Sequence, residues 1–488
     1  MVDLLLSNCP STFTAYKGTR VNAVMQVYPL LNMMCLAAMA RRKGFTVKVV
    51  DLGIDYNPYE TFRRVLQEEW PRFVGITSTT PLFFEAAELS KITRNILGDE
   101  VTIIYGGPHA TALPEESLEL SNFDIAVCGE GEVTLTEILE GKKLAEINGI
   151  YYKQDGRINH TDTRELIKDL DSLPFPALDL YDIKRYRCPE LISKRWPLSQ
   201  IETSRGCPSA CMFCNKNISA RLFRKKSPER VLEEIKYMLS LGVREIRVID
   251  DQFATDINRA KRICELIIKE NLDFSWNMAN GVRVDRVDEE FLILAKRAGC
   301  YQSGIGFESG DQASLDAIDK DITIEQSIKC MELMKKVGGI ETVGFFMLGL
   351  PTDTEESLKK TVNFAVRLMP DLAKATVTIP FPGTRLFEYY EQKGLIKSRN
   401  WSIYNLHKAE EIYDHPILSH DTLKHYYNLF YRKFYFNPKY LMYRLNKSRR
   451  EKTILRDMRY GGQTFFPGLF PVDVKPKPQD QRRELGAN

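Results

Sequence analysis

Three cysteines, Cys207, Cys211 and Cys214, lie within eight residues of a loop that follows a predicted strand. Thiolates are soft ligands that suit iron–sulfur clusters, and three of them can hold three irons of a cubane. A cluster that only transfers electrons normally has a fourth cysteine, but the next one, Cys264, falls in a predicted helix about 50 residues further on. The spacing therefore predicts a cluster with one iron left open to bind a second molecule.

Two other interpretations of these cysteines remain. A structural zinc site prefers four ligands with paired spacing, and the sequence has no second Cys-x-x-Cys and no histidine pair. A protein that stores or transfers electrons without catalysis would have no use for an open iron. The cysteine spacing favours a catalytic cluster over both.

Further polar residues follow the predicted strands that come after the cysteine loop. Asp250 and Asp251 follow the second strand, Arg283 follows the third, and Glu308 and Ser309 follow the fourth. The carboxyl ends of parallel strands form one face of a barrel, and that face carries the active site in such folds. These five residues are candidate ligand contacts, and the alternative for Glu308 and Arg283 is an ion pair with each other.

A second group of unusual residues follows predicted strands in the first 140 residues. The group comprises Thr77, Ser78, Gly106, Gly107, His109, Gly129, Glu130 and Gly131. Glycine lets a backbone approach a bulky ligand closely, and ligands of open parallel sheets bind beyond the carboxyl ends of the strands. These segments are either tight turns between strand and helix or one edge that binds a ligand.

Alternating strand and helix patterns position the glycine-rich segments. Five strands are expected, at Val2–Ser7, Thr46–Asp51, Phe73–Thr77, Val101–Tyr105 and Asp124–Cys128. Amphipathic stretches between them, such as Pro29–Lys43 and Leu82–Leu97, predict helices on both faces of a parallel sheet. The fold class is therefore α/β, with a Rossmann-like, doubly wound sheet first. A hairpin turning at Asp155-Gly156 follows it.

A second alternation positions the cysteine loop. Six strands are expected, at Ser199–Thr203, Glu245–Asp250, Phe274–Ala279, Gln302–Phe307, Thr342–Leu348 and Ala373–Ile379. Six strand–helix units predict a partial (β/α)6 barrel, because a closed barrel has eight. The tyrosine-rich stretch His425–Leu445 predicts a helical cap whose aromatic residues serve packing more than substrate binding.

These patterns predict five segments along the chain. They are a first domain at 1–145, a hairpin and linker at 146–195, the barrel at 196–400, the helical domain at 401–470 and a disordered tail at 471–488. The tail is polar and rich in proline, a composition that does not support a packed core.

Composition excludes several classes of protein. With 488 residues, 43% hydrophobic and 27% charged, the chain is typical of a globular protein with more than one domain. A net charge of +3 gives no reason to expect nucleic acid as a partner. No run of 18 apolar residues predicts a membrane span, and no secretion signal is evident. Ten cysteines without a disulfide pattern fit a reducing cytoplasm.

The Cys-x-x-x-Cys-x-x-Cys motif, with aromatic Phe213 before its third cysteine, resembles the signature of the radical S-adenosylmethionine (SAM) superfamily. The resemblance implies a 4Fe–4S cluster whose open iron binds SAM and cleaves it reductively to a 5′-deoxyadenosyl radical. An electron donor such as flavodoxin or ferredoxin is implied as a partner. The implied SAM contacts are Phe213, Asp250, Asp251, Arg283, Glu308 and Ser309. The family often has a Gly-Gly-Glu-like motif where this chain has Asp250-Asp251, so those two positions depart from the pattern.

The first 145 residues resemble the cobalamin-binding domain that precedes the radical SAM core in one subfamily. The resemblance rests on Gly106-Gly107 with His109, on the Gly129–Glu132 run and on the Leu-Pro-Phe-Pro linker. It implies that the eight residues of the glycine-rich group bind cobalamin. The Asp-x-His-x-x-Gly sequence that gives a histidine to cobalt elsewhere is absent, so cobalamin is expected without a histidine beneath the metal. The alternative is a domain that covers the barrel and binds no corrinoid.

With both cofactors, the resemblance implies methylation of an unactivated carbon in a small-molecule or lipid-like substrate. No side-chain acid or base is required, so no catalytic residue is assigned beyond the cluster ligands. The same subfamily includes an anaerobic oxidative cyclase and ring-rearranging enzymes, which remain alternatives. A methylthiotransferase would need a second cluster in the first domain, and of the available Cys9, Cys35 and Cys128 the second falls in a predicted helix.

Overall fold

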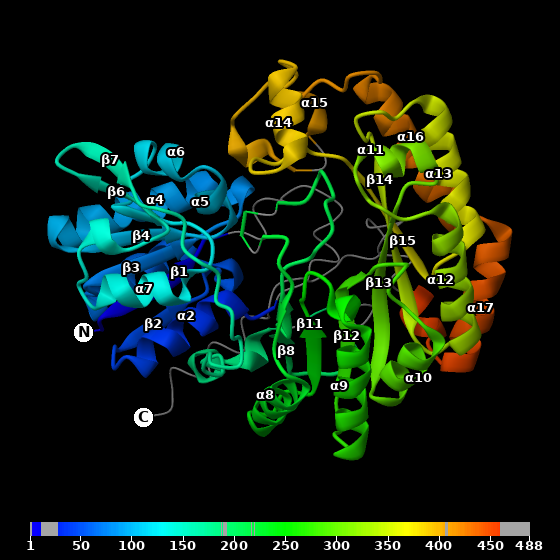
Figure 1. Ribbon diagram of the computed structural model, residues 1–488, viewed down its shortest axis with the longest axis horizontal. Coiled ribbons are helices and arrows are strands. Elements are labelled where there is room, and N and C mark those ends of the chain that lie inside the picture. The colour runs from blue at the N-terminus through cyan, green and yellow to red at the C-terminus, as the bar shows by residue number, and fades with distance from the viewer. Residues whose placement is uncertain are drawn as a thin grey trace.

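The computed structural model has two α/β units side by side (Figure 1). It describes residues 2–10, 28–186, 188, 193–215, 217–218, 220–405 and 408–458. Within these ranges, no helix has the length and apolar character needed to cross a membrane. The segment after Pro471, expected to be disordered, lies outside the described residues.

The first unit is built on a seven-stranded sheet in the order β2-β1-β3-β4-β5-β6-β7. Its parallel strands are β1 (Leu4–Asn8), β2 (Val47–Val50), β3 (Phe73–Thr77), β4 (Thr102–Gly106) and β5 (Ile125–Val127). In four of them, β1, β3, β4 and β5, the central residues are all buried, as expected for a sheet covered on both faces, whereas the edge strand β2 is partly exposed. All five strands expected from the sequence are present, and their observed bounds differ from the expected ones by two residues at most.

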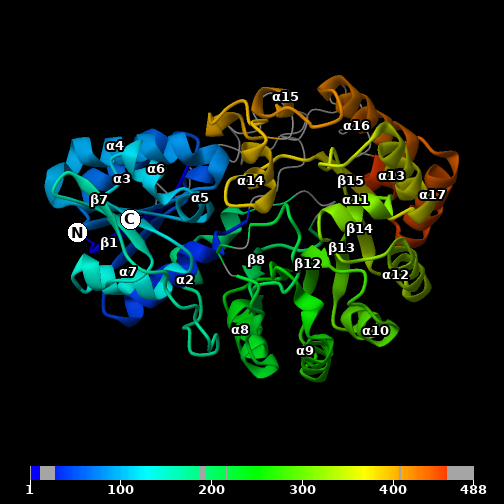
Figure 2. The ribbon, with the colours of Figure 1, turned by 45° about the horizontal axis from the view of Figure 1, so that its top comes forward.

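Helices cover both faces of this sheet (Figure 2). On one face α2 (Leu31–Arg42) contacts α7 (Gly131–Leu139), and on the other α3 (Pro58–Glu69) contacts α4 (Phe83–Leu97). The parallel sheet with helices on both faces is thus the arrangement that the sequence predicts.

A hairpin extends the first sheet. Strand β6 (Ile150–Gln154) pairs antiparallel with both β5 and β7 (Arg157–His160). At the turn, Asp155 and Gly156 have φ values of 51° and 73°, the left-handed conformation that a tight two-residue hairpin requires. The sequence predicts the hairpin and its turn but assigns it to a connecting segment. Local alternation does not reveal that β6 has β5 as a partner.

The second unit contains a six-stranded parallel sheet with its strands in chain order. The strands are β8 (Leu198–Ile201), β11 (Glu245–Val248), β12 (Ser275–Val282), β13 (Cys300–Glu308), β14 (Glu341–Leu348) and β15 (Leu372–Val377). Among the described residues, β8 and β15 each pair on one side only, so the sheet stays open. The helices that follow the strands lie along one face (Figure 1): α8 (Pro228–Ser240), α9 (Ile257–Lys269), α10 (Glu289–Arg297), α12 (Ile324–Val337) and α13 (Glu355–Leu368).

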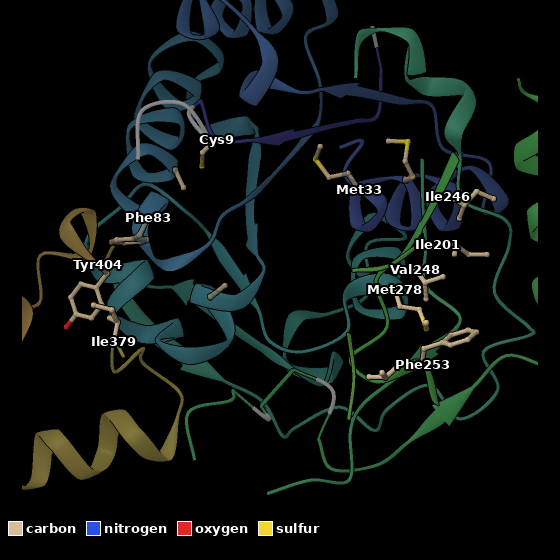
Figure 3. Packing of buried hydrophobic residues seen from close by; sticks show 14 of the residues in the cluster. Cys9, Met33, Phe83, Ile201, Ile246, Val248, Phe253, Met278, Ile379 and Tyr404 are labelled. Atoms are coloured by element: carbon tan, nitrogen blue, oxygen red, sulfur yellow. The ribbon is translucent and has the colours of Figure 1, made fainter. Parts of the chain in front are cut away.

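The two faces of this sheet differ in exposure, because successive side chains of a strand point to opposite sides. Ile201, Val248 and Met278 are buried on the helix-covered face, where Figure 3 shows them gathered together. On the opposite face Arg247 is half-buried and Lys374 is exposed. The sheet therefore has a covered outer face and an inner face on which some side chains reach solvent while others, such as Asn277, are buried.

Helices follow the second sheet and cover its last strand. They are α14 (Arg385–Gln392), α15 (Ala409–Ile412), α16 (His420–Tyr435) and α17 (Pro438–Glu451), of which α16 contacts both α13 and β15. The tyrosine-rich stretch expected to be helical is thus two helices separated by Phe436-Asn437.

Two tyrosines of α16 occupy the free edge of β15. The Tyr435 hydroxyl accepts a hydrogen bond from the Ala373 N–H at 3.1 Å and donates one to the Ala373 carbonyl at 2.9 Å. Tyr431 does the same with Ala375, at 3.2 Å and 3.1 Å. An edge strand otherwise leaves these backbone groups without partners. Both tyrosines therefore have a structural role, in keeping with the packing interpretation of the aromatic stripe.

Replacing both Tyr431 and Tyr435 by phenylalanine is expected to lower the free energy of unfolding by about 2–4 kcal/mol, because each change leaves buried backbone groups unsatisfied. Urea denaturation measures this difference. Tyr389→Phe on α14 is the matched control, since its hydroxyl makes no hydrogen bond within the described residues. An equal loss in the control would contradict the assigned role.

Candidate functional site

The three predicted cluster ligands lie on the loop after β9 (Ser204–Arg205), a short strand paired with β10 (Arg224–Lys225). Cys211 is buried, Cys207 is half-buried and Cys214 is exposed. The Cys214 N–H donates to the Cys211 carbonyl at 3.2 Å, which forms a tight turn between the last two ligands. One end of the cysteine loop thus faces solvent while its middle faces the protein.

Distant segments anchor the cysteine loop. The Met212 N–H donates to the Ile318 carbonyl at 2.9 Å, and the Met212 carbonyl accepts from the Leu386 N–H at 3.0 Å. The Gly206 N–H donates to Oδ2 of Asp251 at 3.0 Å. Since the anchors come from three parts of the second unit, the loop is held in place by the fold around it.

The donor chemistry of the loop fits an iron–sulfur cluster. Its three donors are thiols, the ligands that such clusters take. Arg283 and Lys320 both lie close enough to Cys211 for an electrostatic interaction, and nearby cations favour the thiolate form. In the described part of the chain, no three Cys, His, Asp or Glu side chains converge as ligands of a single metal ion. A cubane does not need such convergence, because each thiolate binds a different iron.

Arg283 holds the cysteine loop in place. Its Nη1 donates to Oγ of Ser209 at 2.7 Å and to the Lys320 carbonyl at 3.0 Å. Its Nε donates to Asp285 at 2.9 Å, so its carboxylate partner is Asp285 and the ion pair with Glu308 considered from the sequence is not formed. Burial alone lowers the pKa of Arg283, but Asp285 and the nearby cysteines raise it by more, so the pKa lies above its ordinary value and the guanidinium stays charged.

Glu308 forms a buried ion pair with Lys320, whose Nζ lies 2.6 Å from Oε1. Glu308 has a φ of 59°, an uncommon conformation for a residue with a side chain, and such residues cluster at functional sites. A Cβ on Gly306 would lie 2.5 Å from Oε1 of Glu308 and 3.0 Å from Nζ of Lys320, so any larger residue there would have to displace the pair. Lys320 also lies 5.9 Å from the ring centroid of Phe213. The structure thus brings Glu308 and Phe213 together near Cys211, with a lysine that sequence reasoning missed.

Two residues predicted to contact SAM are buried and hydrogen-bonded within the protein. Asp250 is 3% exposed, and its carboxylate accepts hydrogen bonds from the backbone and hydroxyl of Thr203 and from the Ser204 hydroxyl. Ser309 is 1% exposed and shares a hydrogen bond with Oγ1 of Thr361 at 3.0 Å. Sequence patterns locate the end of a strand, but they do not show which of its side chains face outward. Asp251, the neighbour of Asp250 in sequence, is exposed and lines a cavity between the two units.

A cavity of about 370 Å³ lies between the two units. The first unit lines it with Thr77, Gly106, Gly107, Gly129, Glu130 and Gly131. The second unit contributes Ser204, Arg205 and Asp251. Gly107 has a φ of 102°, and a Cβ there would lie 2.6 Å from Oγ1 of Thr77, so the backbone turn requires glycine. The structure therefore brings together six of the eight predicted cobalamin contacts.

The other two, His109 and Ser78, do not line the cavity. His109 is fully buried, with Nδ1 3.3 Å from Oγ1 of Thr80 and its ring 4.5 Å from that of Phe83. Burial lowers the pKa of His109 to about 4, so its imidazole is neutral near pH 7. The Ser78 hydroxyl lies 2.6 Å from that of Tyr105. His109 and Ser78 thus pack beside the glycine loops, and no histidine is among the residues lining the cavity.

A buried network of charges, which we call the Arg205 network, joins the two units beside the cavity. Arg205 donates to Glu130 at 3.1 Å and to Glu202 at 2.7 Å, and its third contact is with Glu132. Arg224 also pairs with Glu130, at 2.8 Å. Burial alone lowers the pKa of Arg205, but the surrounding carboxylates raise it above its ordinary value.

The Arg205 network connects the first unit to the segment just before the cysteine loop. Arg205 precedes Cys207 by two residues, and Glu130 and Glu132 lie at the start of α7 in the first unit. The sequence identifies Glu130 and the cysteine motif that follows Arg205. It does not reveal the contact between Glu130 and Arg205, because 75 residues separate them. The carboxylate of Glu130 is thus ion-paired with Arg205 and Arg224, even though the residue lines the cavity.

Comparison with known proteins gives two family matches. Residues 201–365 match the Radical SAM superfamily, and residues 19–139 match the B12 binding domain. The first match contains the cysteine loop, and the second contains all of the glycine-rich segments that line the cavity.

Two curated relatives cover most of the chain. The uncharacterized methyltransferase PH0819 of Pyrococcus horikoshii is 34% identical over 383 residues, which is 77% of this chain and 81% of that protein. The anaerobic magnesium-protoporphyrin IX monomethyl ester cyclase of Rubrivivax gelatinosus is 29% identical over 437 residues, covering 86% of this chain and 76% of the cyclase.

Two solved structures share the fold. The radical SAM methyltransferase TsrM from Kitasatospora setae gives a TM-score of 0.65 at 20% identity, covering 82% of this chain and 77% of that one. The cobalamin-dependent SAM radical enzyme OxsB gives 0.69 at 18% identity, covering 99% of this chain and 75% of that one. At these identities the likeness concerns the fold alone.

Proposed function

Because this chain belongs to the radical SAM superfamily and carries a B12 binding domain ahead of its cysteine loop, we propose that it methylates an unactivated carbon using SAM and cobalamin. The observation that carries the proposal is the cavity shared by the two units. Its lining combines the glycine loops of the B12 binding domain with Ser204, Arg205 and Asp251 beside the cysteine loop. A ligand in this cavity touches both units, as two cooperating cofactors require.

The residues that would hold the cofactors follow from the site. Cys207, Cys211 and Cys214 would bind the cluster, with Phe213, Asp251 and Glu308 as the proposed contacts of SAM. Thr77 and the glycine loops would border the corrin, where small residues allow a close approach. When bound, SAM and the cluster supply a radical that removes hydrogen from an unreactive C–H bond, and cobalamin carries the methyl group.

The chain itself contributes positioning and exclusion of water. Apolar side chains of α2, among them Leu31, Met33 and Leu36, line the cavity and limit its contact with solvent. The Arg205 network fixes the glycine loops relative to the cysteine loop. The exposed end of that loop, at Cys214, gives an electron donor such as flavodoxin or ferredoxin a route of approach.

The same proposal gives each segment a role. Residues 1–145 form the cobalamin unit together with the hairpin of the following segment, 146–195, which pairs with β5. Residues 196–400 act as an open six-stranded barrel, and the helices of 401–470 that the structure describes act as a cap over its last strand.

Anaerobic reconstitution with iron, sulfide and hydroxocobalamin tests the proposal. After addition of SAM and a strong reductant, wild-type protein is expected to yield 5′-deoxyadenosine and to hold one corrinoid. Cys214→Ala is expected to lose the nucleoside but to keep the corrinoid, because the cysteine lies outside the glycine loops. Cys330→Ala, a buried cysteine on α12, is the control that keeps both. Nucleoside without corrinoid would remove the methyl-transfer mechanism, and absence of both would overturn the proposal.

An oxidative cyclase is the second candidate, because the cyclase relative matches 86% of this chain. SAM with a labelled methyl group separates the two functions. Methyl transfer places the label in the product, whereas oxidative cyclisation leaves the label out of it.

The cysteines of the first unit give little support to a third candidate function, that of a methylthiotransferase. The putative methylthiotransferase MJ0865 of Methanocaldococcus jannaschii is 29% identical but matches 63% of this chain. The Cys9 thiol donates to the Thr77 carbonyl at 3.6 Å, and the Cys128 thiol donates to the Ala110 carbonyl at 3.7 Å. These two thiols therefore have separate backbone partners and do not face a shared cluster site.

A further inference from the structure

The inner face of the second sheet carries two cations that the proposed cofactor contacts do not use. The strand register places Lys374 on β15 beside Phe345 on β14. Arg247 on β11 lies in register with Gln200 and Asn277 and points to the same inner face. The alternation of exposure along the strands supports this assignment, since the residues on either side of Arg247 and of Lys374 are buried.

Lys374 is the more unusual of the two. Its side chain is exposed, yet it makes no hydrogen bond or ion pair with any residue that the structure describes. Burial within the surrounding protein nevertheless lowers its pKa, and Arg247 lowers it further. The Lys374 side chain thus reaches water while lying among other protein groups on the inner face of the sheet. A lysine on the outer surface would be exposed without this loss of solvation.

Two acids lie on the same face, and both have other partners. Glu245, two residues before Arg247 on β11, accepts hydrogen bonds from the Tyr301 hydroxyl at 2.7 Å and from the N–H groups of Lys194 and Arg195 at 2.6 Å and 2.7 Å. Glu341 lies on β14 with the same orientation as Phe345, but it is paired with Arg444 of α17 at 2.8 Å. Arg247 lies over the ring of Tyr28, with its guanidinium carbon 4.5 Å from the ring centroid. Lys374 itself has no carboxylate partner among the described residues.

Apolar side chains adjoin the two cations. Phe345 and Met347 are both half-buried on the inner face of β14, the strand that pairs with β15. A molecule bound there would meet an aromatic ring and a thioether on one side and a lysine on the other. Such a surface suits a ligand with one charged end and one apolar part.

Building on the proposed function, we infer that the substrate carries an anionic group, a carboxylate or a phosphate, that binds Lys374 near Arg247. Its apolar part lies against Phe345 and Met347. Charge-assisted hydrogen bonds to the anion offset the cost of holding two cations inside the protein. The carbon to be methylated then belongs to the part of the substrate that extends from this anchor toward the cysteine loop.

Labelling with pyridoxal 5′-phosphate tests this inference without knowledge of the substrate. The reagent forms an imine with a lysine amine, with loss of water, and reduction with cyanoborohydride traps the adduct for peptide mapping. Pyridoxal exists largely as an internal hemiacetal and reacts more slowly with any amine, so the ratio of the two labelling rates is compared between lysines. In the reconstituted holoenzyme, this ratio of pyridoxal 5′-phosphate to pyridoxal is expected to be about tenfold larger at Lys374 than at a surface lysine, because a charge-assisted contact with the phosphate is worth at least that factor. Arg247→Gln is expected to reduce the ratio.

Lys359, an exposed lysine on the outer helix α13, is the matched control and gives the ratio that the two reagents show at a lysine without an anion site. Equal ratios at Lys374 and Lys359, or no adduct at Lys374, would overturn the inference. Competition then identifies the anion: protection by inorganic phosphate indicates a phosphate substrate, protection by acetate indicates a carboxylate, and protection by neither counts against an anion site. Loss of 5′-deoxyadenosine formation from the unlabelled holoenzyme would instead count against the proposed function alone.

Discussion

Replacing Arg205 by methionine is expected to lower the free energy of unfolding by about 3–5 kcal/mol, because it leaves buried carboxylates without their guanidinium. Glu130 and Glu132 are each 7% exposed at the side chain, so water cannot replace the lost contacts. Glu202 loses the same partner. Denaturant unfolding of the apoprotein measures the loss.

Several variants separate this effect from a general response to mutation. Arg399→Met removes an exposed arginine that also has two carboxylate partners, and it is expected to cost less than about 1 kcal/mol. Adding Glu132→Gln to Arg205→Met is expected to recover part of the stability, because one buried charge is then removed. A loss in Arg205→Met no larger than that in Arg399→Met would show that the network contributes little.

A conservative change at Arg205 is expected to affect methyl transfer more than folding. Arg205→Lys keeps one positive charge but cannot donate to three carboxylates in the planar geometry of a guanidinium. We expect it to retain cluster and corrinoid while forming less methylated product per 5′-deoxyadenosine than wild type. A defect confined to folding would lower both products in proportion.

Replacing Lys320 by methionine is expected to have the second large effect, on the cluster as well as on stability. Glu308 would remain buried without a partner, at a cost of about 3–5 kcal/mol. A negative charge would then lie near Cys211 without its cation, and this favours the oxidised cluster over the reduced one. The midpoint potential, followed by electron paramagnetic resonance during a redox titration, is therefore expected to become more negative.

The double variant Lys320→Met with Glu308→Gln tests this explanation. It removes both charges, so the net charge beside Cys211 returns to that of the wild type. Stability and potential are both expected to move back toward wild-type values, and the difference between the single and double variants measures the coupling. Lys360→Met, which removes an exposed lysine paired with Asp311, is the control with an unchanged potential. A potential in Lys320→Met equal to the control would refute the electrostatic role.

Local signals explain why much of this molecule could be predicted from its sequence. The cysteine loop depends on spacing within eight residues, and the strands depend on runs of aliphatic residues with regular turns between them. The glycine loops were predictable for the same reason, since Gly107 needs its conformation whatever lies across the cavity. Six of the eight predicted cobalamin contacts consequently line one cavity.

The remaining features depend on contacts between distant segments. Lys320 acquires its role by meeting Glu308, and Arg205 acquires its role by meeting two glutamates of the other unit. His109 has the right residue type in the right loop, but its ring packs against Phe83 and turns away from the cavity. Asp250 and Asp251 are adjacent in sequence and differ in which way they face. None of these outcomes is fixed by the spacing of residues along the chain.

The tyrosines on the edge of β15 also bear on how this protein avoids aggregation. An open sheet exposes the backbone of its last strand, and that row of donors and acceptors can pair with a strand from another molecule. Tyr431 and Tyr435 fill those positions with hydroxyls of the same chain, which satisfy the backbone but cannot be extended by a further strand. The sheet can thus stay open at β15 without leaving this edge as a template for self-association.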